Sequence, residues 1–223
     1  MRAVGVSVLC LVLLVSLSGC GPAQKTLRPD AEQLTTIQSL AVVVESDSQF
    51  EVIHSRATAD AAGAALFGLV GAAIGSSIDK GEDEKRAEQV ASAVEDLSCK
   101  SLFSKGLSRL QENKRFQSVR IFTEGWNPDQ AADYDAVVMF TIEKWGLRLI
   151  DQESNMVSGF LELDMKMQAG PDMKTIWDER HVLTGQGRKH FREYSANPEL
   201  VKQEMSETLQ QAGINMANLI IYY

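Results

Sequence analysis

The chain has 223 residues, a formal net charge of −8 and 44% hydrophobic residues, which is enough for one domain with a substantial core. Its acidic balance disfavours binding to nucleic acids or anionic lipid headgroups, because like charges repel. The three cysteines are Cys10, Cys20 and Cys99. The first two lie in an N-terminal segment with a separate role, so Cys99 has no disulfide partner within the chain. We expect it to be a small buried core residue; the alternative is a thiol that crosslinks to a partner.

The N-terminus has the layout of an export signal. Arg2 precedes an uncharged apolar run from residue 3 to 17, and small residues then lead to Cys20. The stretch Leu17-Ser18-Gly19-Cys20 resembles the lipobox of bacterial lipoproteins. The resemblance implies a diacylglyceryl group on the Cys20 thiol, cleavage after Gly19, and acylation of the new amino terminus. The alternative is an ordinary signal peptide, or an N-terminal anchor helix, that contains a cysteine.

Lipidation would make the membrane a partner through the lipid anchor, because two or more acyl chains give stable attachment without a protein span. Gly21, not Asp, follows the cysteine, which resembles the outer-membrane class of enteric lipoproteins. We therefore expect attachment to the outer membrane, facing the periplasm, with the inner membrane or the cell surface as alternatives. The expected organisation is a signal peptide at 1–19, a lipidated tether at 20–36 and a single domain at 37–223. Removal of Arg2 would leave a mature net charge of −9.

The mature chain shows an ordered series of elements. IQSLAVVVES predicts a buried strand, residues 59–80 form a glycine-rich apolar insertion, and residues 83–111 predict a long helix. SVRIF and YDAVVMFTIEKWGLRLI predict strands, SGFLELDMKMQA alternates like a half-buried antiparallel strand, and KTIWDERHVLTGQG follows as its hairpin partner. Asn197 and Pro198 fit the start of a last helix. The apolar stripe of the first helix comprises Val90, Val94, Leu97, Phe103, Leu107 and Leu110, and that of the last helix Val201, Met205, Leu209, Ala212, Met216 and Ile220.

This order predicts an α/β two-layer sandwich. The sheet would be mixed and mainly antiparallel, with about five strands covered on one face by helices, and the glycine-rich helix would be inserted. The crossover between the first two strands predicts that they are parallel, and the remaining strands would continue antiparallel. The lipobox, the tether, the LAVVV strand, the crossover helix, the YDAVVMFTI strand and the last helix together resemble periplasmic lipoprotein domains of the CsgG, LpoB and TolB N-terminal type. The glycine-rich stretch departs from that pattern as an insertion.

The stretch AAGAALFGLVGAAIGSSI, at residues 61–78, carries no charge. On a helix its residues sort by size, so that a smooth face of small residues could admit another backbone closely. Its four glycines and its length make a lone membrane span marginal. Three alternatives are open for this segment. It could pack within its own domain, it could form an oligomer by joining several subunits or entering the bilayer, or it could be a flexible loop. Similar glycine-zipper segments occur in TraT-like lipoproteins. The candidate packing and oligomerisation residues are Ala64, Gly68, Gly71, Ala72 and Gly75.

Motifs for catalysis are missing from the sequence: it has no GxSxG, Walker or HExxH pattern and no CxxC pair. His54, His181 and His190 lack metal-ligand spacing, and His181 is expected to be a strand-surface histidine paired with a carboxylate. Trp126, in a turn, is a candidate contact residue. We expect that the protein is not an enzyme and binds no cofactor or metal. The alternative is a hydrolase, which would require a nucleophile and a base to lie together in one pocket.

Two functions remain. The first is a lipid-anchored, non-enzymatic envelope protein that forms a homo-oligomer or scaffolds an assembly through its glycine-rich helix. The second is a monomeric auxiliary lipoprotein that binds a ligand or partner for a transport or cell-wall system. The sequence does not identify the envelope protein partner.

Overall fold

The computed structural model describes residues 26–53, 80–151, 155–170 and 172–223. In these residues, seven strands form one mixed sheet, with the order β3-β1-β4-β5-β6 and two short strands beside β4 and β5. The strands are β1 (Ser39–Ser46), β2 (Phe50–Ile53), β3 (Ser118–Phe122), β4 (Ala136–Asp151), β5 (Met156–Ala169), β6 (Lys174–Thr184) and β7 (Lys189–His190). The helices are α2 (Ala31–Thr35), α3 (Lys80–Ala93), α4 (Cys99–Leu107), α5 (Arg109–Glu112), α6 (Phe191–Ala196), α7 (Pro198–Tyr222) and the 3-10 helix η2 (Pro128–Asp133).

The predicted α/β sandwich with a mixed sheet is confirmed. The five strands of the main order are those expected from the sequence, while β2 and β7 were not predicted. β1 pairs in parallel with β3, as the crossover predicted. β4, β5 and β6 form an antiparallel meander.

The direction of β4 differs from the expectation. It runs parallel to β1 rather than antiparallel, so that β1 lies between two parallel neighbours. The reason is the connection from β3 to β4, which is a crossover segment and not a tight turn. Its residues, including Trp126, Ala131 and Tyr134, form a small apolar cluster with β1, β3 and β4, on the face opposite the main core.

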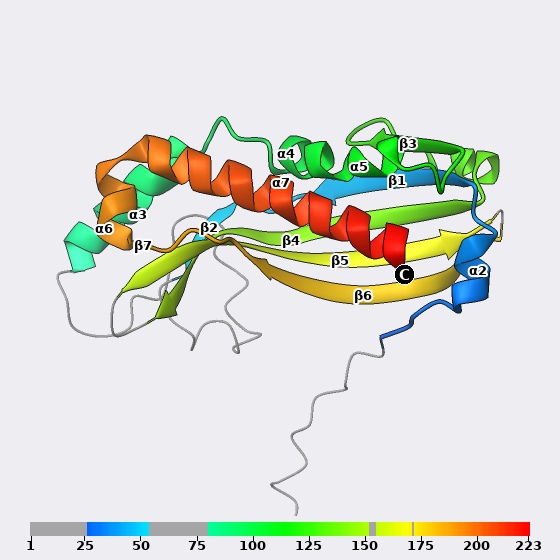
Figure 1. The fold of residues 1–223 in the computed structure, drawn as a ribbon. Coiled ribbons are helices and arrows are strands. Elements are labelled where there is room, and N and C mark those ends of the chain that lie inside the picture. Colours follow the sequence, from blue (N-terminus) through cyan, green and yellow to red (C-terminus); the bar gives the residue numbers. More distant parts are fainter. Residues whose placement is uncertain (1–25, 54–79, 152–154, 171) are drawn as a thin grey trace, which may run out of the picture.

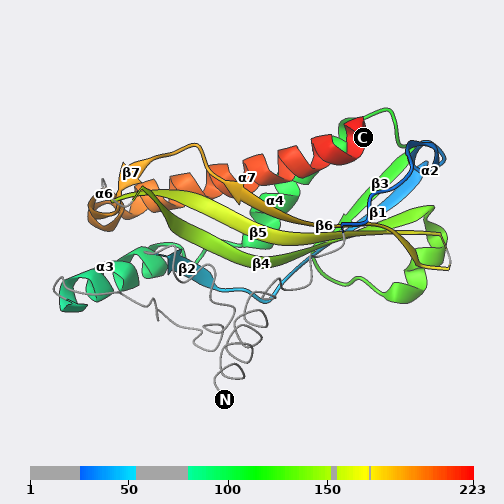
Figure 2. The same cartoon turned by 90° about the horizontal axis from the view of Figure 1, so that it is seen from below.

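One face of the sheet is covered by helices. Figures 1 and 2 show α7 running along the strands, with α4 beside it. The alternating residues of β5 predicted to face inward (Leu161, Leu163, Met165 and Met167) are all buried against this layer. So are the six predicted stripe residues of α7. Trp145 and Trp177 are also buried. In the described residues no helix is both long and apolar enough to cross a membrane.

The predicted helix over 83–111 is three helices, not one. α3 ends at Ala93, α4 begins at Cys99, and α5 follows after Ser108. The hydroxyl of Ser98 caps α4 by accepting a hydrogen bond from the Ser101 backbone N–H at 3.2 Å. The apolar residues predicted for one long helix still face the same side, because the turns between α3, α4 and α5 change the direction of the helix axis without turning these side chains away from the core. The predicted helical insertion at 59–80 lies outside the described residues, except for Lys80 at the start of α3.

Helices α4 and α7 approach each other through glycines. A Cβ atom on Gly213 would stand 2.1 Å from the Phe103 carbonyl oxygen, and one on Gly106 would stand 2.1 Å from the Gln210 carbonyl oxygen. Both neighbours are backbone atoms that cannot rotate away. The two helices therefore need small residues at these positions to pack as closely as they do.

Candidate functional site

Most residues that the sequence singled out for function lie outside the described residues. These are the lipidation candidate Cys20 and the packing candidates Ala64, Gly68, Gly71, Ala72 and Gly75. Their roles stay predictions.

The histidines do not form a site in the described chain. His54 lies outside the described residues, His181 is on β6 and exposed His190 caps α6. His181 Nε2 is 4.0 Å from Glu179 Oε2, so a carboxylate does lie beside it, but this nitrogen is buried and makes no hydrogen bond, unlike the surface pair that was predicted. Burial lowers the pKa of His181, against the opposing effect of the Glu179 carboxylate. Among the described residues no three His, Cys, Asp or Glu side chains could together hold a metal ion.

Cys99 and Trp126 both contact their own chain. Cys99 is a free, buried thiol whose Sγ donates to Ser46 Oγ at 3.4 Å, and burial raises its pKa. This confirms Cys99 as a core residue. Trp126 is half-buried, with its ring 5.0 Å from that of Phe122 and 6.4 Å from that of Tyr134.

The segment before β1 is docked on the domain from Leu27 onward. Leu27 forms an antiparallel bridge with Asp178 of β6, with backbone hydrogen bonds of 3.1 and 2.8 Å. Beside it, Arg28 Nη2 lies 2.7 Å from Glu179 Oε1. Burial opposes ionisation of Glu179, but hydrogen bonds from Arg28 and Trp177 outweigh it, so the pKa of Glu179 is lowered.

The next residues are anchored more deeply. Leu34 and Ile37 are part of the main core. Arg115 ties α2 to the end of α7, because its guanidinium donates to the Leu34 carbonyl at 3.3 Å and to the Ile220 carbonyl at 2.8 Å. Only six residues, 21–26, therefore separate Cys20 from the docked chain.

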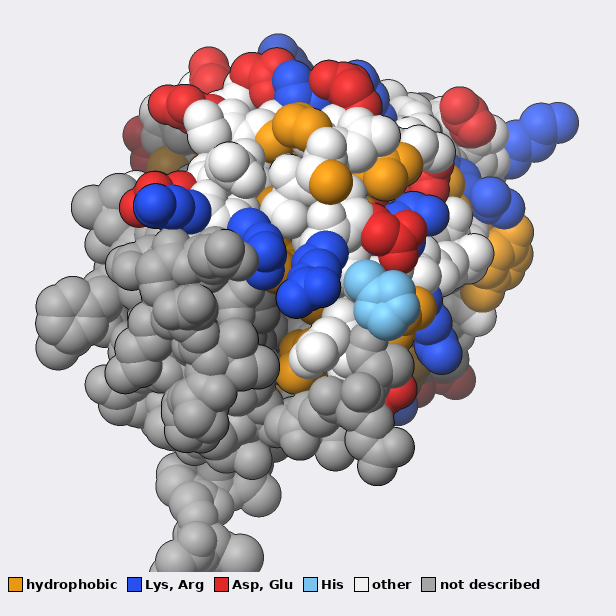
Figure 3. Space-filling model, turned by 90° about the vertical axis from the view of Figure 1, so that its left-hand side faces the viewer, with side chains coloured by type: hydrophobic (Ala, Val, Ile, Leu, Met, Phe, Trp, Pro, Cys, Tyr) orange, Lys and Arg blue, Asp and Glu red, His pale blue; other side chains and the backbone are white. Residues whose placement is uncertain are grey.

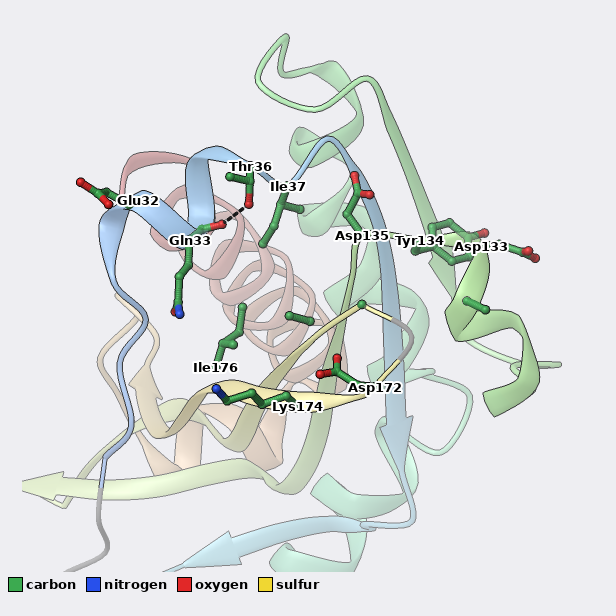
Figure 4. A pocket seen from close by; sticks show the side chains of 13 residues that line it. Glu32, Gln33, Thr36, Ile37, Asp133, Tyr134, Asp135, Asp172, Lys174 and Ile176 are labelled. Atoms are coloured by element: carbon green, nitrogen blue, oxygen red, sulfur yellow. Dashed lines mark hydrogen bonds between the residues drawn. The ribbon is translucent and has the colours of Figure 1, made fainter.

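A cavity of about 680 Å³ lies between α2 and the turn from β5 to β6. Figure 4 shows Ile37 and Ile176 in its middle, with Glu32 and Asp133 pointing outward on opposite sides. Asp135 is engaged elsewhere: its Oδ2 accepts from the backbone N–H groups of Gln38 (2.9 Å) and Ser39 (2.8 Å), which lowers its pKa. The acidic side chains around this cavity do not converge, and we assign no ligand to it.

A buried carboxylate on α7 is the most specific polar feature of the described domain. Glu204 is only 6% exposed. Its Oε1 accepts a hydrogen bond from the Gly159 N–H at 3.0 Å and one from the Thr208 hydroxyl at 3.4 Å. Buried carboxylates are costly unless they are hydrogen-bonded in this way.

Three glycines make room for this carboxylate. A Cβ on Gly187 would stand 1.7 Å from Glu204 Oε2, and one on Gly185 would stand 2.6 Å from Oε1. On Gly159 it would collide with the Thr208 hydroxyl at 2.3 Å. The glycines come from β5 and from the loop between β6 and β7, so that two separate segments close around one side chain of α7.

Tyr194 of α6 lies near Glu204. Its ring is fully buried, and its hydroxyl makes no well-formed hydrogen bond to any described group. Burial, followed by the nearby Glu204 carboxylate, raises the pKa of Tyr194 above its usual range. The tyrosine is therefore neutral at physiological pH.

Glu204 also lines a cavity of about 410 Å³ between α7 and the loop from β6 to β7. The described residues that line it include no Lys, Arg or His. Amide and hydroxyl groups surround the two carboxylates, which suits hydrogen bonding to a hydroxyl-bearing or ammonium-bearing ligand. The polar lining residues are Thr184, Gln186, Glu204, Glu207, Thr208, Gln210, Gln211 and Asn215.

The sequence contained a signal for this feature. Glu204 and Thr208 fall three and seven positions after Val201, which places them on the apolar stripe of the last helix. A carboxylate at such a position must find hydrogen-bond partners inside the fold. Those partners could not be identified, because they come from distant segments.

Comparison with known proteins gives no family for this chain. No family model matches it, and no curated protein matches it. A Xanthomonas campestris protein of the DUF330 family is 9% identical over 86% of this chain and 89% of its own, with a TM-score of 0.46. PelC from Paraburkholderia phytofirmans, a dodecamer, is 12% identical over 85% of this chain and 94% of its own, with a TM-score of 0.32.

A Caulobacter crescentus protein provisionally described as a lipoprotein is 8% identical over 62% of this chain and 99% of its own, with a TM-score of 0.28. Similarities at these identities and TM-scores establish neither a shared family nor a shared function.

Proposed function

We propose that this protein is a lipid-anchored, non-enzymatic envelope protein that self-associates or scaffolds a periplasmic or outer-membrane assembly. The lipobox at residues 17–20 is the sequence basis for the anchor. The observation that carries the proposal is the docking of Leu27 and Arg28 on β6, which leaves six residues to the proposed lipid site. A tether of that length holds a domain against a membrane instead of letting it range through the periplasm.

The glycine-rich segment is the proposed contact with other copies. In the sequence it joins β2 to α3, and if it is helical its small residues would fall on one side of the helix. The core of the described residues is built from the sheet, α2 to α7 and the side chains between them. The described residues thus have a core of their own.

Two measurements test the proposal. Labelled palmitate should enter the wild-type protein and not Cys20→Ser, and equal labelling of the two would refute the anchor. In detergent, the wild type should have the mass of an oligomer, and Gly71→Leu with Gly75→Leu should reduce it. A wild type that is monomeric, and whose mass these substitutions leave unchanged, would refute self-association.

The second candidate function is a monomeric ligand-binding lipoprotein, and the cavity beside Glu204 favours it. Glucosamine and N-acetylglucosamine are suitable probes, because they share hydroxyl groups but only the former carries an ammonium group. Glucosamine should shift the amide resonances of Gly185 and Gly187, and Glu204→Gln should abolish the shift. The absence of any shift with either sugar would argue against this candidate.

A further inference from the structure

Four large hydrophobic side chains are exposed in the described chain: Leu27 (45%), Val182 (54%), Tyr222 (71%) and Tyr223 (40%). Three of them lie on or beside β6, and the fourth, Tyr222, precedes Tyr223 at the end of α7. Leu27 bridges Asp178, Val182 belongs to the strand, and the Tyr223 ring packs 4.7 Å from that of Trp177. We call these four side chains the β6-edge patch. Single exposed hydrophobic residues are ordinary, but here three of the four lie at one edge of the sheet.

The backbone at this edge is open as well. β6 is the last strand of the sheet order, and its Asp178 N–H is taken by the Leu27 carbonyl at 2.8 Å. In an extended strand every second N–H points the same way, so those of Arg180 and Val182 point outward, and no described residue pairs with them. An open edge needs a covering surface or water.

We infer that the β6-edge patch rests on the interfacial region of the lipid bilayer; this rests on the proposed lipidation of Cys20. Seven Cα steps separate Cys20 from Leu27, so Leu27, where the tether meets the patch, stays within about 24 Å of the lipid attachment point even when the tether is fully extended. The membrane is thus the surface that this edge meets most often.

The chemistry of the patch fits the interfacial depth. Tyrosine is enriched there because its ring is apolar and its hydroxyl remains hydrated. Outward N–H groups can find water or lipid carbonyl groups at this level, but not in the hydrocarbon core. The charges beside the patch are mixed, with Arg28 and Arg180 next to Asp178 and Glu179. A zwitterionic surface is therefore the appropriate partner.

A competing surface lies at the other end of α7. Figure 3 shows Lys and Arg side chains gathered there, and the β7–α6 segment contributes Arg188, Lys189 and Arg192. The 25 residues of α7 set this end about 37 Å from the C-terminal tyrosines. The tether attaches at the tyrosine end, which favours the β6-edge patch.

The experiment is a relaxation measurement in nanodiscs. The protein is purified from bacterial membranes, and its mass reports whether Cys20 carries lipid. If it does not, the Cys20 thiol of a Cys10→Ser variant is coupled to a maleimide phospholipid; buried Cys99 is protected. Orientation is thus measured in either case, and a failure of lipidation is distinguished from a failure of this inference.

Phosphatidylcholine nanodiscs containing a gadolinium-chelating lipid provide the readout, which is the enhanced relaxation of backbone amides. Because β3 lies four strand spacings beyond β6, about 19 Å, and the effect falls with the sixth power of distance, amides of Leu27, Val182 and Tyr222 should relax more than about tenfold faster than those of β3. Equal rates at both edges, or the fastest rates at residues 188–192, would overturn the inference.

Two variants separate the patch from the tether. Val182→Ser with Tyr222→Ser should reduce the contrast between β6 and β3, whereas Gln203→Ser with Gln211→Ser, at exposed positions of α7 outside the patch, should leave it unchanged. A flexible linker of about twelve residues inserted after Ala23 should also reduce the contrast. A contrast that survives both the patch substitutions and the long linker would show that another surface holds the domain.

Discussion

The close approach of α4 and α7 gives the sharpest stability prediction. In Gly213→Ala, the new Cβ would stand 2.1 Å from the Phe103 carbonyl oxygen and 3.0 Å from the Gly106 Cα. Since non-bonded carbon contacts are favourable at about 3.5–4.0 Å, the two helices must separate by more than about 1 Å. The buried side chains between them, such as Phe103, Leu107 and Leu209, would then lose contacts.

The magnitude follows from two opposed effects. Overpacking a core costs about 1–3 kcal/mol, and a clash with rigid backbone belongs at the upper end of that range. Alanine has a higher helix propensity than glycine and returns about 1 kcal/mol. The net loss in the free energy of unfolding is about 2 kcal/mol, which for a domain of this size lowers Tm by about 4–8 °C.

Thermal unfolding followed by circular dichroism measures this change. Gln211→Ala is the matched control, because it changes an exposed position of the same helix and should alter stability by less than about 0.5 kcal/mol. A Gly213→Ala variant with an unchanged or higher Tm would refute the reasoning, since the propensity gain would then act without a steric cost.

Three further predictions concern single contacts. Asn197→Ala removes the side-chain cap of α7 and should cost about 1 kcal/mol in urea unfolding; an unchanged midpoint would contradict the cap. The lowered pKa of Asp135 stabilises the fold above its ordinary value of about 3.9 and loses that effect as pH falls through the folded pKa. Asp135→Asn should therefore be less stable than the wild type at pH 7 and equal to it near pH 2; a constant difference would be inconsistent. Cys99 should react with Ellman's reagent slowly in buffer and rapidly in denaturant, because it is buried and its pKa is raised.

Local signals carried the successful parts of the sequence analysis. The alternation in β5 and the Asn197–Pro198 start of α7 each depend on a few neighbouring residues, and both are confirmed. The break between α3 and α4 was missed because apolar spacing continues through Leu97. Ser98 was the available signal, as a serine before a new apolar run is a typical helix cap.

Non-local features could not be predicted in the same way. The direction of β4 depends on where the segment between β3 and β4 packs. From the sequence, this short segment was interpreted as a turn, which would make the two strands antiparallel. In the fold, half-buried Trp126 of that segment packs against Phe122 and Tyr134. Likewise, Glu204 could be placed on the buried face of α7 from the sequence, but its partner Gly159 lies 45 residues away.

The role of a glycine depends on what lies opposite it, which the sequence does not state. The glycines at 61–78 are clustered in the sequence, whereas the glycines that allow close packing in the described chain are dispersed. Gly106 and Gly213 admit a helix backbone, and Gly185 and Gly187 admit a carboxylate. The first pair supports the premise that small residues bring helices together in this protein. The second pair shows that glycine can also create room for a polar group, which makes the Gly71 and Gly75 substitutions necessary to determine which use the clustered segment has.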